Sequence, residues 1–166
     1  MRTFNEFKSI FGSIKEDDAK HRAHLDKTGF WGKEGAGVVF MAKDTGRLLI
    51  AKRSRHVQEP GTWSTWGGAL DEGEDALAGA KREAEEEAGA GSHVISYHMV
   101  HEFVVPDKFK YTTFIALVET EFRPSMNWET ANYEWVEYGD WPTPIHRGFA
   151  ETIKEPSFRR TYEELR

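Results

Sequence analysis

Apolar residues at helical spacing open the chain. Over residues 3–15 they recur at three- and four-residue intervals, the pattern of an amphipathic helix, and Gly12 interrupts it only mildly: Phe4, Phe7, Ile10, Phe11 and Ile14. The apolar face of this predicted helix needs a surface, either on its own domain or on a second copy of the chain in a homodimer. Residues 16–33 are mostly polar and end in a Gly-Phe-Trp-Gly run at 29–32. We expect this stretch to be a connector with an aromatic anchor.

Two apolar runs joined by a turn follow the connector. Residues 37–42 (GVVFMA) and 48–53 (LLIAKR) predict the strands of a β-hairpin, with Gly46 supplying a permissive turn position. Later runs predict strands at about 94–105, 111–119 and 133–138, and a short helix at about 145–154. Strands before and after a helix, with a second helix near the end, favour a mixed sheet between helices.

Residues 75–88 have the spacing of a helix. Asp75 is a suitable N-cap because its carboxylate can accept hydrogen bonds from the free N–H groups of the first turn. Gly89 is a suitable C-terminal stop because glycine readily adopts the left-handed conformation. Small and apolar side chains three and four positions apart predict one buried stripe, made of Leu77, Ala80, Ala84 and Ala88.

Composition narrows the class of protein. Of the 166 residues, 39% are hydrophobic and 30% are charged, which is typical of a soluble globular protein with one domain and terminal extensions. No transmembrane stretch and no secretory pattern is visible, so we expect a cytoplasmic protein with no membrane partner. The absence of cysteine excludes disulfides, thiolate metal sites and cysteine nucleophiles. Any metal must therefore bind to oxygen or imidazole.

The overall charge limits the kind of partner. A formal net charge of -6 repels polyanions, so no long nucleic acid is expected as a partner. A small phosphate-bearing ligand can still bind where a cation bridges it to the acidic surface.

Negative charge is concentrated in the last turn of the predicted helix. Glu83, Glu85, Glu86 and Glu87 occupy four of five successive positions, where the helix dipole disfavours each carboxylate by about 0.3 to 1 kcal/mol. A divalent cation would resolve this conflict, because Glu86 and Glu87 each lie within about 60° of Glu83 around the axis. Magnesium suits two or three carboxylates together with substrate phosphates. A solvated acidic face is the alternative interpretation.

The residues around this run form a longer pattern. Gly68 is followed after five positions by Glu74, after seven more by Arg82, and then by Glu83, Ala84, Glu85, Glu86, Glu87, Ala88, Gly89 and Ala90. The segment resembles the Nudix box, Gly-x5-Glu-x7-Arg-Glu-U-x-Glu-Glu-x-Gly-U, in which U is a bulky aliphatic residue. Every fixed position matches at its spacing. The chain departs from the pattern in having alanine at both U positions, and Trp66 stands where many members have proline.

The resemblance implies a fold and a reaction. The fold is α/β, the Nudix fold, an α/β/α sandwich with a mixed β-sheet over residues 34–154. Residues 1–33 would then be an N-terminal helix and connector, and residues 155–166 a C-terminal tail. The reaction is water attack on phosphorus in the diphosphate linkage of a small nucleotide-like substrate, with Mg2+ as cofactor or Mn2+ in its place.

Carried over by position, the resemblance also implies roles for the box residues. Glu83, Glu86 and Glu87 would be metal ligands, and the Gly68 carbonyl could be another. Arg82 and Glu74 would form an ion pair that fixes the loop against the helix.

The catalytic base is less narrowly defined. In the family it is either a box glutamate, here Glu83 or Glu86, or a glutamate on a later loop. Glu129 is the loop candidate, because its spacing to Glu134 and Trp135 resembles that of some members. The alternative is that Glu129 is an ordinary exposed glutamate.

Substrate contacts are expected from two kinds of residue. Lys52 and Arg53 end a predicted strand that should approach the loop before the box, so one of them would contact phosphate; surface charge is the alternative. A nucleoside would need a stacking surface, for which Trp66 is a candidate among several aromatics, most of which should belong to the core: Trp63, Trp66, Phe109, Tyr111 and Trp128.

Several substrates and two rival functions remain open. Nucleoside diphosphate sugars including ADP-ribose come first, followed by (deoxy)nucleoside triphosphates, dinucleoside polyphosphates and capped RNA 5′ ends. Pro106 lies sixteen residues past the box, where it resembles a mark of ADP-ribose pyrophosphatases, although a turn proline explains it equally. The rivals are a catalytically silent nucleotide sensor, which would commonly lack box glutamates, and a structural acidic domain, which would need no magnesium.

Overall fold

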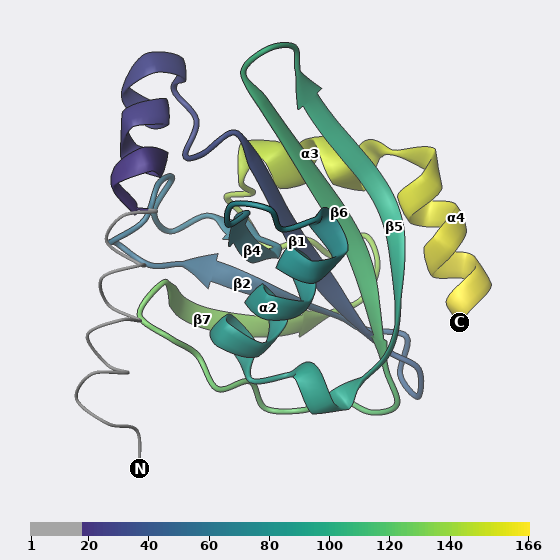
Figure 1. The fold of residues 1–166 in the computed structure, drawn as a ribbon. Helices are drawn as coiled ribbons and strands as arrows, with labels where there is room; N and C mark the ends of the chain where they lie inside the picture. The colour runs from purple at the N-terminus through teal and green to yellow at the C-terminus, as the bar shows by residue number, and fades with distance from the viewer. Residues whose placement is uncertain (1–17) are drawn as a thin grey trace.

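One sheet organises the part of the chain that the computed structural model describes, residues 18–166 (Figure 1). The predicted helix at 3–15 lies outside these residues. The sheet has the strand order β3-β2-β1-β6-β5, with β4 paired to β1 and β7 paired to β2. The strands are β1 (Glu34–Ala42), β2 (Leu48–Arg53), β3 (Trp63–Ser64), β4 (Trp66–Ala69), β5 (Val94–Val105), β6 (Phe109–Val118) and β7 (Thr130–Val136).

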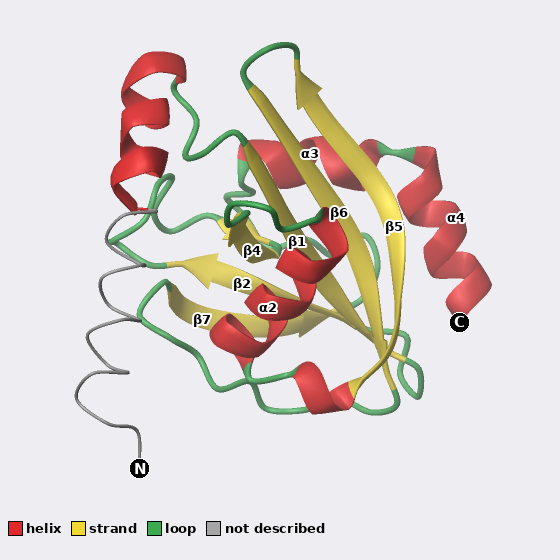
Figure 2. Ribbon diagram, viewed as in Figure 1, coloured by secondary structure: helices red, strands yellow, loops and turns green. Residues whose placement is uncertain are grey.

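Helices cover both faces of this sheet (Figure 2). They are α2 (Ala76–Ala88) on one face, α3 (Arg147–Lys154) and α4 (Pro156–Leu165) on the other, the short 3-10 helix η1 (Gly91–His93), and a helical segment at 18–28. β1 and β6 are parallel, whereas the other paired strands are antiparallel. The expected α/β/α sandwich with a mixed sheet is therefore confirmed.

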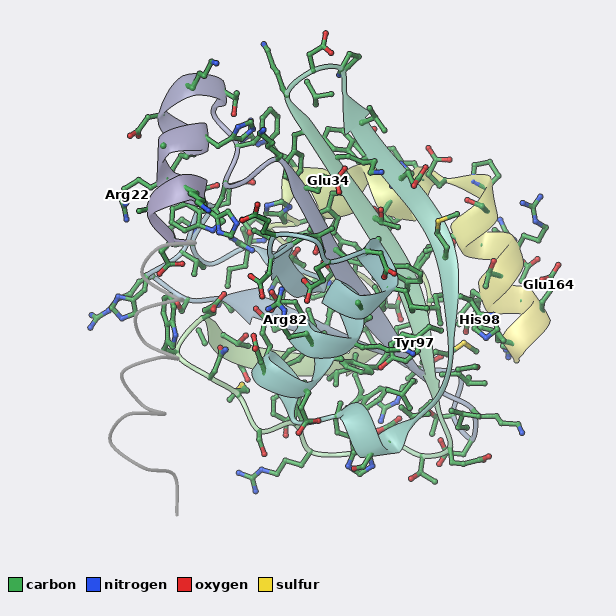
Figure 3. All side chains as sticks on the ribbon, viewed as in Figure 1. Arg22, Glu34, Arg82, Tyr97, His98 and Glu164 are labelled. Atoms are coloured by element: carbon green, nitrogen blue, oxygen red, sulfur yellow. The ribbon has the colours of Figure 1, made fainter. Side chains whose placement is uncertain are left out.

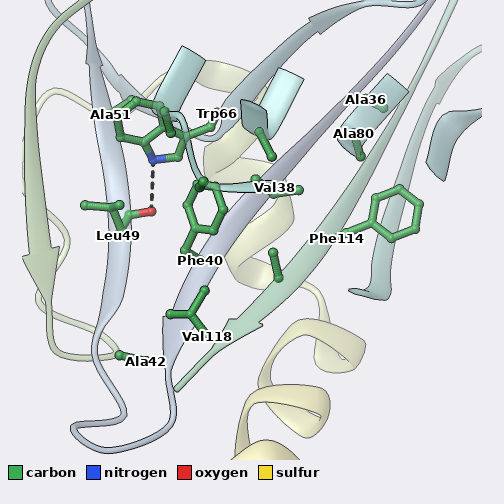
Figure 4. Packing of buried hydrophobic residues seen from close by; sticks show 14 of the residues in the cluster. Ala36, Val38, Phe40, Ala42, Leu49, Ala51, Trp66, Ala80, Phe114 and Val118 are labelled. Carbon is green, nitrogen blue, oxygen red and sulfur yellow. Dashed lines mark hydrogen bonds between the residues drawn. The ribbon is translucent and has the colours of Figure 1, made fainter. Parts of the chain in front are cut away.

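The central strand β1 explains why both faces are covered. Side chains alternate along a strand, and in β1 both sets are apolar. Val38 and Phe40 pack beneath α2, and Val39 and Met41 pack beneath α3 and α4; all four are fully buried. Figure 4 shows the α2 side of this core, where the fully buried Trp66 packs near Phe40 and donates to a backbone carbonyl.

The predicted hairpin is present. β1 and β2 pair antiparallel with Phe40 opposite Leu49, and Gly46 in the connecting turn has a φ of 71°. This positive φ favours glycine, as the turn prediction required. The later strands and α3 also form: β5 has the predicted ends, and the ends of β6, β7 and α3 differ from the predicted ones by at most three residues.

Helix α2 begins and ends where expected, but its buried stripe differs. The Asp75 carboxylate accepts from the Ala78 N–H at 2.7 Å, and Gly89 is left-handed with a φ of 63°. Leu77 is 39% exposed, so its assignment to the core was wrong. The helix is rotated so that Glu83 and Glu87 face the sheet beside the three buried alanines.

Two segments that lack a clear sequence signal are helical. Residues 155–166, predicted to be a tail, instead contain the whole of α4, whose Phe158 and Tyr162 are buried in the core beneath the sheet. Residues 18–28, predicted to belong to a polar connector, form a helix that lies beside the sheet edge near the β5–β6 turn (Figure 1). Among the described residues, no helix has the length and apolar character needed to cross a membrane.

Candidate active site

Two carboxylates of α2 lie between the helix and β4. Glu83 is 7% exposed and Glu87 is 4% exposed. The Gly67 N–H donates to the Glu87 carboxylate. A side chain at Gly68 would place its Cβ 2.7 Å from Glu83 Oε1, so glycine is needed there for the carboxylate to approach the strand. The Gly-Gly pair of β4 therefore makes room for the acidic face of α2.

Arg82, labelled in Figure 3, joins the loop before α2 to the acidic residues. Its guanidinium makes a bidentate pair with Glu74 through Nε and Nη2, both at 2.9 Å. Although burial alone would raise the pKa of Glu74, the hydrogen bonds from Arg82 lower it below its usual value. Nη2 also donates to the Ala69 carbonyl at 3.0 Å. Arg82 thereby holds the loop against the helix.

The remaining nitrogen of Arg82 lies between two box glutamates. Nη1 donates to Glu83 Oε1 and to Glu86 Oε2, each at 2.9 Å. The two carboxylates therefore lie on either side of one nitrogen atom. Glu86 is the accessible member, since its side chain is 56% exposed.

Glu129 brings a fourth carboxylate from a different part of the chain. It precedes β7 in a turn in which the Asn127 side chain accepts from the Glu129 N–H at 2.9 Å. The Glu129 carbonyl accepts from the Ser54 N–H at 2.9 Å, which ties the turn to the end of β2. The carboxyl group of Glu129 lies close enough to Glu87 to raise the pKa of Glu87.

The protonation of this cluster reflects its burial. Burial raises the pKa of Glu83 to about 7, against the opposing charge of Arg82. Burial also raises the pKa of Glu87 well above its usual range, with a further contribution from the neighbouring carboxylates, and it raises the pKa of Glu129. Fully ionised, these carboxylates would hold more negative charge than Arg82 alone offsets.

The donor set fits a divalent cation. All the side-chain donors are carboxylate oxygens, which are the ligands of hard cations such as Mg2+. A cation beside Glu87 and Glu129 would offset the repulsion between their carboxylates. Among residues 18–166 no three acidic or histidine side chains are already gathered closely enough to form a site on their own. A cation held here would therefore also need ligands from substrate and water, as is usual for Mg2+.

A cleft of about 1930 Å³ opens beside the carboxylates. Glu83, Glu86 and Glu129 line it, together with residues from the 18–31 segment and from the loop after β2. Arg53 also lines the cleft, and within residues 18–166 no carboxylate lies within 4 Å of its guanidinium, which donates to the Gln58 carbonyl at 2.6 Å. The cleft therefore brings a cationic side chain opposite an acidic helix.

His146 connects two walls of the cleft. Its Nδ1 accepts from the Gly148 N–H at 3.1 Å and so caps α3, while its Nε2 lies 2.7 Å from Glu59. Because Nδ1 accepts, the ring is neutral with its proton on Nε2, which donates to Glu59. Burial, together with the charges of Arg53 and Arg147, lowers the pKa of His146 to about 4, although Glu59 opposes the shift.

Comparison with known proteins identifies the family. The family description of the NUDIX domain matches residues 33–155, which is most of the chain. The chain belongs to the Nudix family. It is a pyrophosphohydrolase that acts on nucleoside diphosphate derivatives, and Nudix enzymes generally use divalent metal ions. No curated protein sequence matches the chain significantly.

Solved Nudix structures share the fold. The Nudix hydrolase RenU from M. smegmatis is 28% identical, with a TM-score of 0.67 over 82% of this chain and 90% of that one. An Ap4A hydrolase from C. elegans is 20% identical, with a TM-score of 0.60 over 79% and 97% of the two chains. A MutT protein from Methanosarcina mazei is 18% identical, with a TM-score of 0.62 over 78% and 94%. The latter two comparisons establish the fold alone.

The Nudix fold brings most of the predicted site residues together. The box glutamates, Gly68 and the Arg82–Glu74 pair gather at one end of the cleft, and Glu129 joins them from a loop. Lys52 does not line the cleft; its Nζ lies 5.8 Å from the centre of the Trp63 ring. Trp66 is fully buried in the core beneath α2 and does not reach the cleft either, because strand alternation turns its side chain towards that core.

Sequence reasoning missed the other walls of the cleft. His146 and Glu59 lie 87 positions apart and meet only through the bridge between β3 and the segment before α3. The position of His146 immediately before α3 was the one local signal, since a residue there can cap the helix. The wall at 18–31 had no such signal.

Proposed function

We propose that this Nudix chain is a Mg2+-dependent hydrolase that cleaves the diphosphate linkage between a nucleoside diphosphate and another moiety, by water attack on phosphorus. The observation that carries the proposal is that the buried Glu83 and Glu87 lie near the half-buried Glu129 and the exposed Glu86, beside a large cleft. Burial of so much negative charge is costly unless a bound cation compensates it.

The box residues would hold the metal. Glu83, Glu86 and Glu87 are the side-chain ligands, and the Gly68 carbonyl is a further one on β4. Bound magnesium supplies positive charge that offsets the charge of the diphosphate oxygens during attack. Arg82 and Glu74 keep the loop and helix at a constant separation, so that Gly68 stays beside Glu83.

Two further residues would act on the substrate and the water. Arg53 binds and orients diphosphate oxygens, since it faces the cleft with no carboxylate partner among residues 18–166. Glu129 accepts the proton of the attacking water, because its carboxylate lines the cleft on an anchored turn and burial raises its pKa, which makes it a better base.

The cleft favours a substrate with two moieties. Its volume of about 1930 Å³ exceeds the roughly 300 to 1,000 Å³ of a usual small-molecule pocket. A nucleoside diphosphate sugar, ADP-ribose among them, places one group on each side of the diphosphate and is our first candidate. Dinucleoside polyphosphates share this bipartite form and come next.

A panel assay tests the proposal. Phosphate or nucleotide release is measured from nucleoside diphosphate sugars, nucleoside triphosphates and dinucleoside polyphosphates, with Mg2+ and after chelation with EDTA. We expect turnover of at least one bipartite substrate, abolished by EDTA and restored by Mg2+. Turnover that persists in EDTA would overturn the role of the metal. A folded protein that binds nucleotides but cleaves no panel member would instead be a sensor.

A further inference from the structure

Trp128 stands apart from the other tryptophans of the chain. Of the six, five have a ring or cation partner or are buried: Trp31, Trp63, Trp66, Trp135 and Trp141. Trp128 is 65% exposed and has no aromatic or cation contact with any other residue in the described range 18–166. An exposed indole of this size on the wall of a cleft has a large apolar face left for a ligand.

The turn that carries Trp128 is held in place. Asn127 accepts from the Glu129 N–H through its side chain at 2.9 Å and from the Thr130 N–H through its carbonyl at 3.3 Å. The Glu129 carbonyl is bonded in turn to the Ser54 N–H. Trp128 lies between these anchored neighbours, so its backbone is fixed before any ligand binds. A pre-organised aromatic ring loses little entropy on stacking.

The same turn sets the indole beside the groups that would handle the diphosphate. Trp128 is adjacent to Glu129, and the Ser54 bond joins the turn to the residue that follows Arg53. All three side chains, Trp128, Glu129 and Arg53, line the one cleft. A ligand whose phosphates lie at Arg53 and the acidic helix would therefore place its neighbouring group near the indole.

We propose that Trp128 is the stacking residue for the nucleobase, and that the cleft selects diphosphates that carry a planar heterocycle over those that do not. This inference rests on the proposed function for the position of the diphosphate. It assigns the nucleoside end of the substrate to the Asn127–Glu129 turn and the second moiety to the opposite wall, at residues 18–31. Stacking tolerates every base, so the preference is for a base rather than for one base.

Binding measurements with two matched ligands test this. ADP and ribose 5-diphosphate both carry a diphosphate on the ribose 5-oxygen, but only ADP has a base. Calorimetric Kd values in Mg2+ are compared for the wild type, Trp128→Ala, Trp128→Phe and Met126→Ala. Met126 is the matched control, because it is 42% exposed on the same loop but does not line the cleft.

We expect Trp128→Ala to raise the Kd for ADP about tenfold, equivalent to about 1.4 kcal/mol, and to leave the Kd for ribose 5-diphosphate unchanged. Trp128→Phe should keep most of the affinity, because a smaller ring still stacks, and Met126→Ala should match the wild type. For any nucleotide that is turned over, KM should rise in Trp128→Ala with kcat within about twofold, since the residue binds without touching the reacting atoms.

Three results would overturn the inference: equal weakening of both ligands, no weakening of ADP, or a wild type that binds ADP no better than the base-free ligand. Failure of the proposed function looks different. If ADP binding depends on Trp128 but no panel member is hydrolysed, the base site stands and the proposed hydrolase activity is excluded. If Mg2+-dependent hydrolysis is unchanged in Trp128→Ala, the proposed function stands and Trp128 is excluded as the base site.

Discussion

At the scale of single residues, the inward-facing glutamates of α2 oppose stability. Glu83 and Glu87 lie one helical turn apart on the face of α2 that also holds the buried alanines. An apolar side chain at either position would avoid the cost of desolvation. Ala80, Ala84 and Ala88 allow the helix to approach the sheet closely, and that approach is what buries the two carboxylates. Their position thus serves ligand binding rather than folding.

Glu86→Gln should abolish turnover while the fold is retained. The change removes a charged ligand that is 56% exposed, so little packing is lost. Stability should stay within about 1 kcal/mol of the wild type, because relief from the helix dipole and loss of the exposed pair with Arg82 roughly cancel. Glu85→Gln is the control: that side chain accepts from the Gly91 N–H and points away from the cleft. Steady-state kinetics measure turnover and urea melts measure stability in both variants. Full activity in Glu86→Gln would exclude Glu86 from the site.

His146 should make stability depend on pH. Its folded pKa of about 4 lies below the usual 6.5, so between these values the unfolded chain binds more protons than the folded one. Stability is therefore complete above about pH 6.5 and falls as the pH drops towards 4. His146→Asn can still cap α3 but does not titrate, so its melting temperature should fall less over this window. If the melting temperatures of the wild type and His146→Asn fall equally over this window, His146 is not the group that makes stability depend on pH.

At the scale of elements, α2 is positioned by its two ends. Asp75 caps the first turn, Gly89 ends the last, and the Ser125 N–H bonds to the Ala88 carbonyl beyond it. Arg82 ties the middle of the helix to the preceding loop. The acidic last turn therefore keeps its place despite the unfavourable dipole.

Asp75→Ala should lower stability by about 1 kcal/mol through loss of the cap. Asp75→Asn keeps an acceptor oxygen for the Ala78 N–H and should remain close to the wild type. Because the cap lies at the end of α2 distant from the glutamates, kcat below the melting temperature should be unchanged in both. Chemical denaturation gives the comparison, and equal losses in the two variants would mean that charge, rather than capping, is responsible.

At the scale of the whole molecule, the sheet is shared by two cores. The α2 core supports the acidic site, and the α3–α4 core closes the opposite face. α4 belongs to the second core through Phe158, which is fully buried, and through Tyr162, whose hydroxyl donates to the Gly46 carbonyl at 2.9 Å. The C-terminal residues thus brace the β1–β2 turn from behind.

Phe158→Ala should destabilise the protein by about 3 to 5 kcal/mol, the usual cost of emptying a buried phenylalanine site. Arg159→Ala, at the next position on the exposed side of α4, should change stability by less than about 0.5 kcal/mol. Thermal and urea melts of both variants test whether α4 is part of the core. Nearly equal melting curves for the two variants would mean that residues 155–166 are a tail and not part of the core.

Local spacing alone determined much of this protein. The caps at Asp75 and Gly89 and the β1–β2 hairpin depend on residues near in sequence, whose geometry follows from helix and strand periods. The pairing of Arg82 with Glu74, the family and its reaction were predicted from the resemblance of residues 68–90 to the Nudix box.

Only the tertiary structure decided which faces are buried and which distant segments meet. Leu77 is exposed because the sheet receives Glu83 and Glu87 instead, and Trp66 is buried because its side chain packs near Phe40 beneath α2. Arg53 and Glu129 meet because β2 pairs with β7. These outcomes depend on contacts between residues far apart in sequence, which no local pattern encodes.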